Sequence, residues 1–167
     1  ANIVAVTEKL KRRRVDVIGG GGTGSYVVDL LAKTPVAEIH IWDADTFIQH
    51  NAFRTPGAAS SDELREKLTK VQRLTNIYSK MRRGIVPHPV NMTPEYLDEL
   101  DGTEFVFLCM EGAGKREIVE KLEALNVPFV DVGLGIYEKN GQLGGVVRTT
   151  TSTPGMRDHV RDKKRIS

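Results

Sequence analysis

The chain has little cysteine, no long apolar run and no leading basic segment. Cys109 is the single cysteine among 167 residues, so the chain can form neither an internal disulfide nor a zinc cage built from several cysteines. No stretch approaches the roughly 18 apolar residues of a membrane-spanning helix. Apolar residues come first and cations follow, which is the reverse of a secretory signal peptide. These absences predict a cytoplasmic protein with no membrane span and no zinc.

A strong excess of one charge is also lacking. The 24 lysine and arginine residues against 22 acidic residues give a net charge of +2, which predicts no bulk attraction to nucleic acid or lipid. Cations gather in residues 9–14 and 157–165, and each run either contacts phosphate or forms a solvated flank. The length suits one domain. We expect a basic flank over 1–13, a domain over 14–150 and a polar, basic tail over 151–167, consistent with the start of a crossover loop or of a truncated segment.

Short apolar runs alternate with amphipathic segments along the chain. The pattern predicts strands over 15–18, 39–42, 85–90, 105–109, 127–132 and 142–149, and helices over 25–33, 61–81, 94–100 and 115–125. Ser60 and Glu63 fit a capping box at the start of the second helix. This alternation indicates an α/β fold, a doubly wound, Rossmann-like and mainly parallel sheet with helices on both faces. Ligands of such sheets bind at the carboxyl ends of the strands, just after Ile18, Trp42 and Cys109.

A glycine-rich loop follows the first strand. Gly19, Gly21 and Gly24 form a Gly-x-Gly-x-x-Gly pattern that opens the first helix. Glycine permits the tight turn, the close approach of backbone to phosphate and the helix–strand packing, and the helix N-terminus attracts an anion. Asp43 ends the second strand and could accept hydrogen bonds from ribose hydroxyls. The pattern predicts nucleotide binding, and the alternative is a structural turn beside an exposed aspartate.

The next segment carries a second pattern, Asp43-Ala-Asp45 followed by Asn51-Ala-Phe-Arg54. Together with the loop Gly19-Gly20-Gly21-Gly22-Thr23-Gly24, this segment resembles the signature of the ThiF/MoeB family, the adenylation domain also found in ubiquitin-activating enzymes. The resemblance covers about residues 14–148. It implies an ATP-binding adenylation domain, an adenylyltransferase that activates a carboxylate, and assembly as a homodimer or heterodimer.

Two further positions match the family. Lys70-Val71 corresponds to a lysine step on the helix after the arginine, with Lys67 as a second candidate. Cys109-Met110-Glu111-Gly112 corresponds to a stretch in which the family has aspartate where this chain has Glu111. The resemblance implies that Arg54 and Lys70 stabilise phosphate charge and that Glu111 binds Mg²⁺, a hard ion that prefers carboxylate oxygen. Lys70 could otherwise be one of many solvated helix lysines, and Arg54 a surface arginine.

The resemblance thus implies ATP and Mg²⁺ as cofactors, with Arg54, Lys70 and Glu111 as the catalytic residues. The implied ATP site consists of Gly19, Gly21, Gly22, Gly24, Asp43, Asn51, Arg54, Lys70 and Glu111. His50 adjoins this segment and is a candidate for the pocket wall. Cys109 closes an apolar strand, and we expect no thioester cysteine in this domain.

The implied acceptor is the C-terminal carboxylate of a small ubiquitin-like or sulfur-carrier protein, and a carboxylate on a tRNA nucleoside is an alternative. Two other readings of the domain stay open. One is an NAD-binding Rossmann oxidoreductase, because nicotinamide enzymes share the loop and the ribose acid. The other is a catalytically inactive partner subunit of a heterodimer, which Glu111, the missing zinc cysteines and the short N-terminal region would suit.

Overall fold

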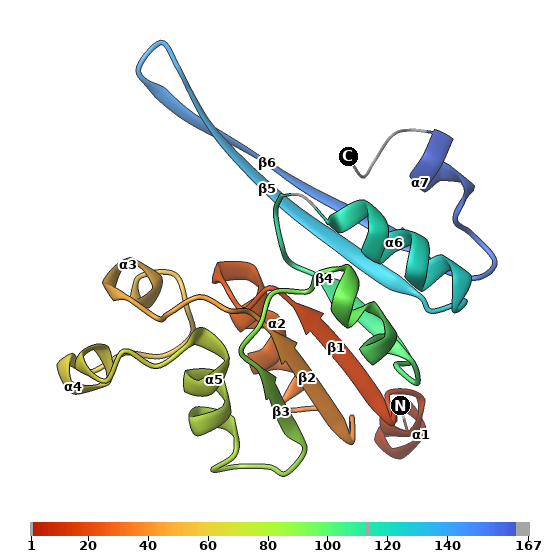
Figure 1. The fold of residues 1–167 in the computed structure, drawn as a ribbon, viewed down its shortest axis with the longest axis horizontal. Helices are drawn as coiled ribbons and strands as arrows, with labels where there is room; N and C mark the ends of the chain where they lie inside the picture. The colour runs from red at the N-terminus through yellow and green to blue at the C-terminus, as the bar shows by residue number, and fades with distance from the viewer. Residues whose placement is uncertain (1, 113, 163–167) are drawn as a thin grey trace.

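A computed structural model describes residues 2–112 and 114–162 and shows six strands in one sheet, in the order β3-β2-β1-β4-β5-β6 (Figure 1). The first five strands are parallel, and β6 is antiparallel to β5. This arrangement confirms the predicted doubly wound, mainly parallel sheet. The strands are β1 Arg14–Ile18, β2 Glu38–Trp42, β3 Ile85–His88, β4 Phe105–Leu108, β5 Phe129–Lys139 and β6 Gln142–Ser152.

Helices cover both faces of the sheet, because side chains of each strand alternate between two apolar clusters. Val15 and Val17 pack with α2 (Gly22–Leu31) and α5 (Lys70–Tyr78), whereas Ile18 packs with the 3₁₀ helix η1 (Pro94–Leu100) and with α6 (Lys115–Ala124). Val160 of α7 (Asp158–Asp162) is buried in the second cluster, so the tail packs against the domain. The remaining helices are α1 (Ile3–Lys9), α3 (Gln49–Ala52) and α4 (Ser61–Arg65). Within the described ranges, no helix is both long and apolar enough to span a bilayer.

The single helix expected over 61–81 is wrong, because the chain forms two helices there. The predicted capping box is present: Glu63 N–H donates to Ser60 Oγ, and Ser60 N–H donates to Glu63 Oε2. A second capping box at Thr69 and Gln72 then starts α5. Lys67 between them has φ +51°, a left-handed conformation that interrupts a helix. The break places Lys70 in the first turn of a new helix.

Strand β5 continues to Lys139, well beyond the expected 127–132, whereas β6 begins at Gln142 as expected and ends at Ser152, shortly after the expected 149. They pair over their whole length and form a long hairpin that projects from the body of the molecule (Figure 1). Asn140 and Gly141 form its two-residue turn with φ of +53° and +76°, the conformation that favours Asn-Gly. The outer half carries exposed apolar side chains, including Leu134, Ile136 and Leu143. Cross-strand pairing, not burial, sets the length of these strands.

A stack of aromatic rings lies on the η1 side of the sheet, at β2 and β3. His88 stacks on Trp42 with ring centroids 3.6 Å apart, and its Nε2 hydrogen-bonds His40 Nδ1 at 2.9 Å. Trp42 Nε1–H donates to the fully buried Asp16 carboxylate. Burial first, and then the facing His40, lower the pKa of His88 to about 4. The folded state therefore holds His88 neutral.

This depressed pKa predicts a loss of stability in mild acid. The unfolded chain binds a proton at His88 near pH 6.5 and the folded chain only near pH 4. The free energy of unfolding therefore decreases as the pH is lowered from 6.5 to 4. His88→Phe keeps a stacked ring but cannot be protonated. Over this pH range we expect its free energy of unfolding to decrease by about 1 to 3 kcal/mol less than that of the wild type. Denaturant titrations at several pH values would measure both proteins. Parallel curves of stability against pH would contradict the prediction.

Candidate nucleotide-binding site

A cavity of about 1010 Å³ lies at the carboxyl ends of β1, β2 and β4, where the sequence placed the ligand. Its walls are formed by the glycine loop after β1, the acidic end of β2, the first turn of α5 and the loop after β4. Parallel strands bring these segments to one edge although they are far apart in the chain. The predicted residues among its walls are Gly19, Gly21, Gly22, Asp43, Arg54, Lys70 and Glu111.

Three glycines of the loop meet different constraints. Gly19 has φ +98°, and a Cβ there would lie 2.6 Å from the carbonyl oxygen of Cys109. A Cβ on Gly24 would lie 1.8 Å from the carbonyl oxygen of Gly19, so Gly24 permits the packing of α2 and does not line the cavity. A Cβ on Gly21 would meet nothing within 4 Å. The fold requires glycine at Gly19 and Gly24, and Gly21 leaves room for a ligand against the backbone.

Asp43 is held by the backbone on both sides of its carboxylate. Gly20 N–H donates to Oδ2 at 2.8 Å, and Asp45 N–H donates to Oδ1 at 2.9 Å. The side chain is buried, yet it lines the cavity. The carboxylate is therefore oriented before any ligand binds, with lone pairs left to accept ribose hydroxyls.

Lys70 bridges the two aspartates of the Asp-x-Asp pattern. Its Nζ lies 2.5 Å from Asp45 Oδ2 and 3.3 Å from Asp43 Oδ1, and the side chain is buried. The other lysine candidate, Lys67, is exposed and does not line the cavity. The structure thus singles out Lys70 as the lysine at the nucleotide cavity, held in place by Asp43 and Asp45.

Arg54 lies beside the N-terminus of α2. A Cβ on Gly22 would lie 3.4 Å from the Arg54 carbonyl oxygen and 3.6 Å from its Cδ, so the arginine lies against the loop. The side chain is exposed, and within residues 2–112 and 114–162 its guanidinium has no hydrogen bond or ion pair. A free guanidinium next to unpaired helix N–H groups forms an anion-binding arrangement.

Glu111 follows β4 and is exposed to the cavity. Across the described chain, its carboxylate has no ion pair or hydrogen bond, so both oxygens are free. No group of three or more His, Cys, Asp or Glu side chains suited to a metal is found in the described residues. Mg²⁺ typically takes one or two carboxylates and completes its shell with phosphate and water. Glu111 fits an ion of this kind that arrives with a nucleotide.

Asn51 and His50 do not line the cavity. Asn51 is buried, and its Oδ1 accepts the N–H of Ile48 at 2.9 Å within the short helix α3. His50 on the same helix is exposed. The structure gives Asn51 a role in shaping the segment that leads to Arg54, and its contact with a nucleotide stays a prediction.

A group of charges beside Glu111 was not predicted from the sequence. Lys115 Nζ donates to Asp131 Oδ1 at 2.6 Å, and both side chains are buried. Arg148 lies on the other side of Asp131, with 3.6 Å between Nη2 and Oδ2. Asp131 interrupts the apolar run of β5, and an acid in a buried strand requires a cation nearby. An acid within this apolar run was the feature of the sequence that could have indicated a buried ion pair.

Known proteins share sequence and fold with this chain. The family model described as "ThiF family" matches residues 3–165. A curated relative, adenylyltransferase and sulfurtransferase UBA4 of Yarrowia lipolytica, is 25% identical over 143 residues, which are 79% of this chain and 35% of the relative. The chain therefore spans about a third of that protein.

Solved structures share the fold at low identity. MccB of E. coli, crystallised with MccA, has a TM-score of 0.72 at 19% identity, covering 99% of this chain and 50% of that one. The E. coli tRNA N6-threonylcarbamoyladenosine dehydratase TcdA, in complex with ATP, has a TM-score of 0.65 at 16% identity, covering 80% and 60%. With the family model matching nearly the whole length, this chain belongs to the ThiF family.

Proposed function

We propose that this chain transfers AMP from ATP to the C-terminal carboxylate of a small ubiquitin-like or sulfur-carrier protein. The proposal is carried by one observation: the glycine loop, Asp43, Arg54, Lys70 and Glu111 all line a single cavity. The names of the relatives, an adenylyltransferase and an ATP complex among them, support adenylation at the level of the family.

In the proposed reaction, an oxygen of the acceptor carboxylate attacks the α-phosphorus of ATP. The bond from that phosphorus to the bridging oxygen breaks, and pyrophosphate leaves with the electron pair. Negative charge grows on the phosphate oxygens during this step. The α2 N-terminus and the free guanidinium of Arg54 are placed to stabilise it, and Lys70 adds a second cation once phosphate competes for its ammonium group.

Mg²⁺ bound at Glu111 would neutralise phosphate charge and screen the acceptor carboxylate from it. Asp43 would hold the ribose, since its carboxylate is fixed by backbone donors and faces the cavity. These two acids have separate roles because one is oriented and buried while the other is exposed and free.

The nature of the acceptor is inferred from the relatives. UBA4 is named as a sulfurtransferase as well as an adenylyltransferase, and MccB was crystallised with MccA. These two names support a protein or peptide carboxylate, whereas TcdA, named as a tRNA dehydratase, supports the tRNA nucleoside as the alternative. A cytoplasmic location and assembly as a homodimer or heterodimer belong to the proposal through the family resemblance alone.

Cys109 is unsuited to covalent chemistry although it borders the cavity. Burial first, and then the Asp131 carboxylate, raise the pKa of its thiol to about 12. Cys109 is therefore protonated at neutral pH, and a thiol acts as a nucleophile only as the thiolate. Adenylation without a thioester at Cys109 is the chemistry that this cavity supports.

The first prediction concerns the choice of nucleotide. ATP·Mg should bind at least about tenfold more tightly than NAD, because a charge-assisted contact to an extra phosphate contributes about 1.5 to 3 kcal/mol. Asp43→Asn should weaken ATP binding by a similar factor through the ribose. Calorimetric titrations on one preparation measure both effects. Tighter binding of NAD would favour the oxidoreductase alternative.

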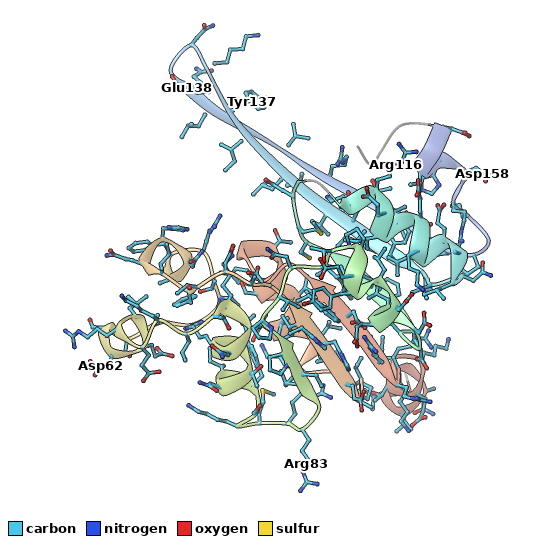
Figure 2. All side chains as sticks on the ribbon, in the orientation of Figure 1. Asp62, Arg83, Arg116, Tyr137, Glu138 and Asp158 are labelled. Carbon is cyan, nitrogen blue, oxygen red and sulfur yellow. The ribbon has the colours of Figure 1, made fainter. Side chains whose placement is uncertain are left out.

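The second prediction separates binding from catalysis. Arg54→Ala and Lys70→Ala should lower ATP–pyrophosphate exchange by about 10² to 10³ while changing ATP affinity much less, because phosphate charge peaks in the transition state. The acceptor in the assay is a synthetic hexapeptide ending in Gly-Gly with a free carboxylate. Arg83→Ala is the matched control, since Arg83 points away from the body of the molecule (Figure 2).

Exchange near wild type in folded Arg54→Ala and Lys70→Ala proteins would remove these residues from the catalytic set. A wild-type protein that binds ATP·Mg but shows no exchange, with the peptide or with small proteins ending in Gly-Gly, would instead indicate an inactive partner subunit.

The third prediction tests the state of the thiol. Native Cys109 should react with iodoacetamide at pH 8 about 10³-fold more slowly than an unperturbed cysteine, because its thiolate fraction falls with the raised pKa. The same thiol should react at the normal rate in guanidinium chloride. Mass spectrometry follows the adduct over time. Rapid alkylation of the folded protein would show that the thiol is reactive.

A further inference from the structure

A second cavity of about 560 Å³ adjoins the nucleotide site on the α6 side of β5. Its walls come from the loop after β4, the first turn of α6 and the facing residues of β5 and β6. Glu111 and Leu134 line both cavities, so the two meet at the residue assigned to Mg²⁺. Lys115 and Arg148 are the cations that line it within the described chain.

The two cations differ in how completely their charges and N–H groups are already paired. Lys115 is buried and forms a close ion pair with the fully buried Asp131. Arg148 is only partly satisfied: its Nη2 is 3.6 Å from Asp131 Oδ2, beyond hydrogen-bond distance, and its buried Nε has no hydrogen-bond partner. A buried donor without an acceptor costs about 1 to 3 kcal/mol. A ligand with acceptor oxygens would recover that free energy.

Glycine keeps the floor of this cavity open. Gly133 pairs with Arg148 across the hairpin, and a Cβ on Gly133 would lie 3.7 Å from Arg148 Nη2. Gly135, two residues further along the same face, has nothing within 4 Å of its Cβ position. The guanidinium therefore lies over backbone that carries no side chain at Gly133, and the space at Gly135 is open.

The edge of the sheet favours an extended peptide as the ligand. β6 is the last strand in the sheet order, so in the part of the chain that the structure describes its outer backbone edge pairs with no strand. Val146 and Val147 beside that edge are exposed. The hairpin reaches outward from the body of the molecule, with Tyr137 and Glu138 near its far end (Figure 2). Unpaired edge strands of this kind accept extended peptides through backbone hydrogen bonds.

We propose that Arg148 binds the C-terminal carboxylate of an extended acceptor peptide in this second cavity and positions it next to Glu111. The planar guanidinium matches a carboxylate through two parallel hydrogen bonds, and Asp131 orients the arginine from its far side. The inference rests on the proposed function, because the bound carboxylate is the nucleophile of adenylation. Arg148 then determines acceptor binding, whereas Arg54 and Lys70 act on ATP.

The test measures peptide binding to the full chain saturated with Mg²⁺ and α,β-methylene-ATP, a non-reacting analogue. The probes are a hexapeptide ending in Gly-Gly with a free carboxylate and the same peptide as its C-terminal amide. Wild type should bind the acid at least about tenfold more tightly than the amide. Arg148→Gln should abolish that preference, and Arg148→Lys should restore part of it. Arg116→Gln is the control, because Arg116 is an exposed residue of α6 that lines neither cavity.

Several outcomes would overturn the proposal. They are equal binding of acid and amide to wild type, no binding of either peptide, and an unchanged preference in Arg148→Gln. Weaker binding of the ATP analogue to Arg148→Gln, with peptide binding intact, would assign Arg148 to phosphate instead. A separate ATP·Mg titration without peptide keeps the two proposals apart: its failure removes the proposed function, whereas normal ATP binding without acid preference removes only the role of Arg148.

Discussion

The nucleotide cavity depends on how the Asp43 carboxylate is held. It accepts the Gly20 and Asp45 N–H groups and contacts the Lys70 ammonium. One side chain therefore connects the glycine loop after β1, the end of β2 and the first turn of α5. A change that released Asp43 would free both the loop and the lysine, because each hydrogen bond restrains a different segment. The positions of Gly21 and Arg54 depend on the same geometry, since Gly21 lies on that loop and Arg54 lies against it.

Much of this arrangement could be predicted because it follows from local sequence. Alternating apolar runs predict strands and helices, and parallel strands bring their carboxyl ends together, so a motif after each strand predicts a common site. Gly19 and Asp43 were found this way, whereas Arg54, Lys70 and Glu111 were placed by the resemblance to the ThiF/MoeB signature. The Ser60–Glu63 capping box was predicted for the same reason, since both partners lie within one turn of helix.

Other features depend on contacts that local patterns do not reveal. The outer hairpin buries little, so its length follows from cross-strand pairing, although Asn140-Gly141 is a hairpin signal that could have been recognised. The helix break at Lys67 reflects a second capping box and the pairing of Thr46 with Thr69. Arg148 meets Asp131 only because β6 returns antiparallel to β5. The Thr46–Thr69 and Arg148–Asp131 contacts join residues that are distant in sequence, which local patterns do not reveal.

The loop after β4 borders both cavities through Glu111, and the charges around the nucleotide cavity favour a cation at this residue. The described walls of the nucleotide cavity carry carboxylates at Asp43, Asp45 and Glu111 against cations at Arg54 and Lys70, which leaves one net negative charge. A triphosphate would be repelled by this balance, although the α2 N-terminus partly offsets it. A divalent cation at Glu111 would make the net charge of the cavity positive. Lys70 alone does not do so, because Asp43 and Asp45 already neutralise its ammonium group. Glu111 also borders the cavity of Arg148, so the same ion would draw an acceptor carboxylate toward the phosphate. The free carboxylate of Glu111, unpaired in the described chain, is thus the point at which nucleotide charge and acceptor charge can be brought together.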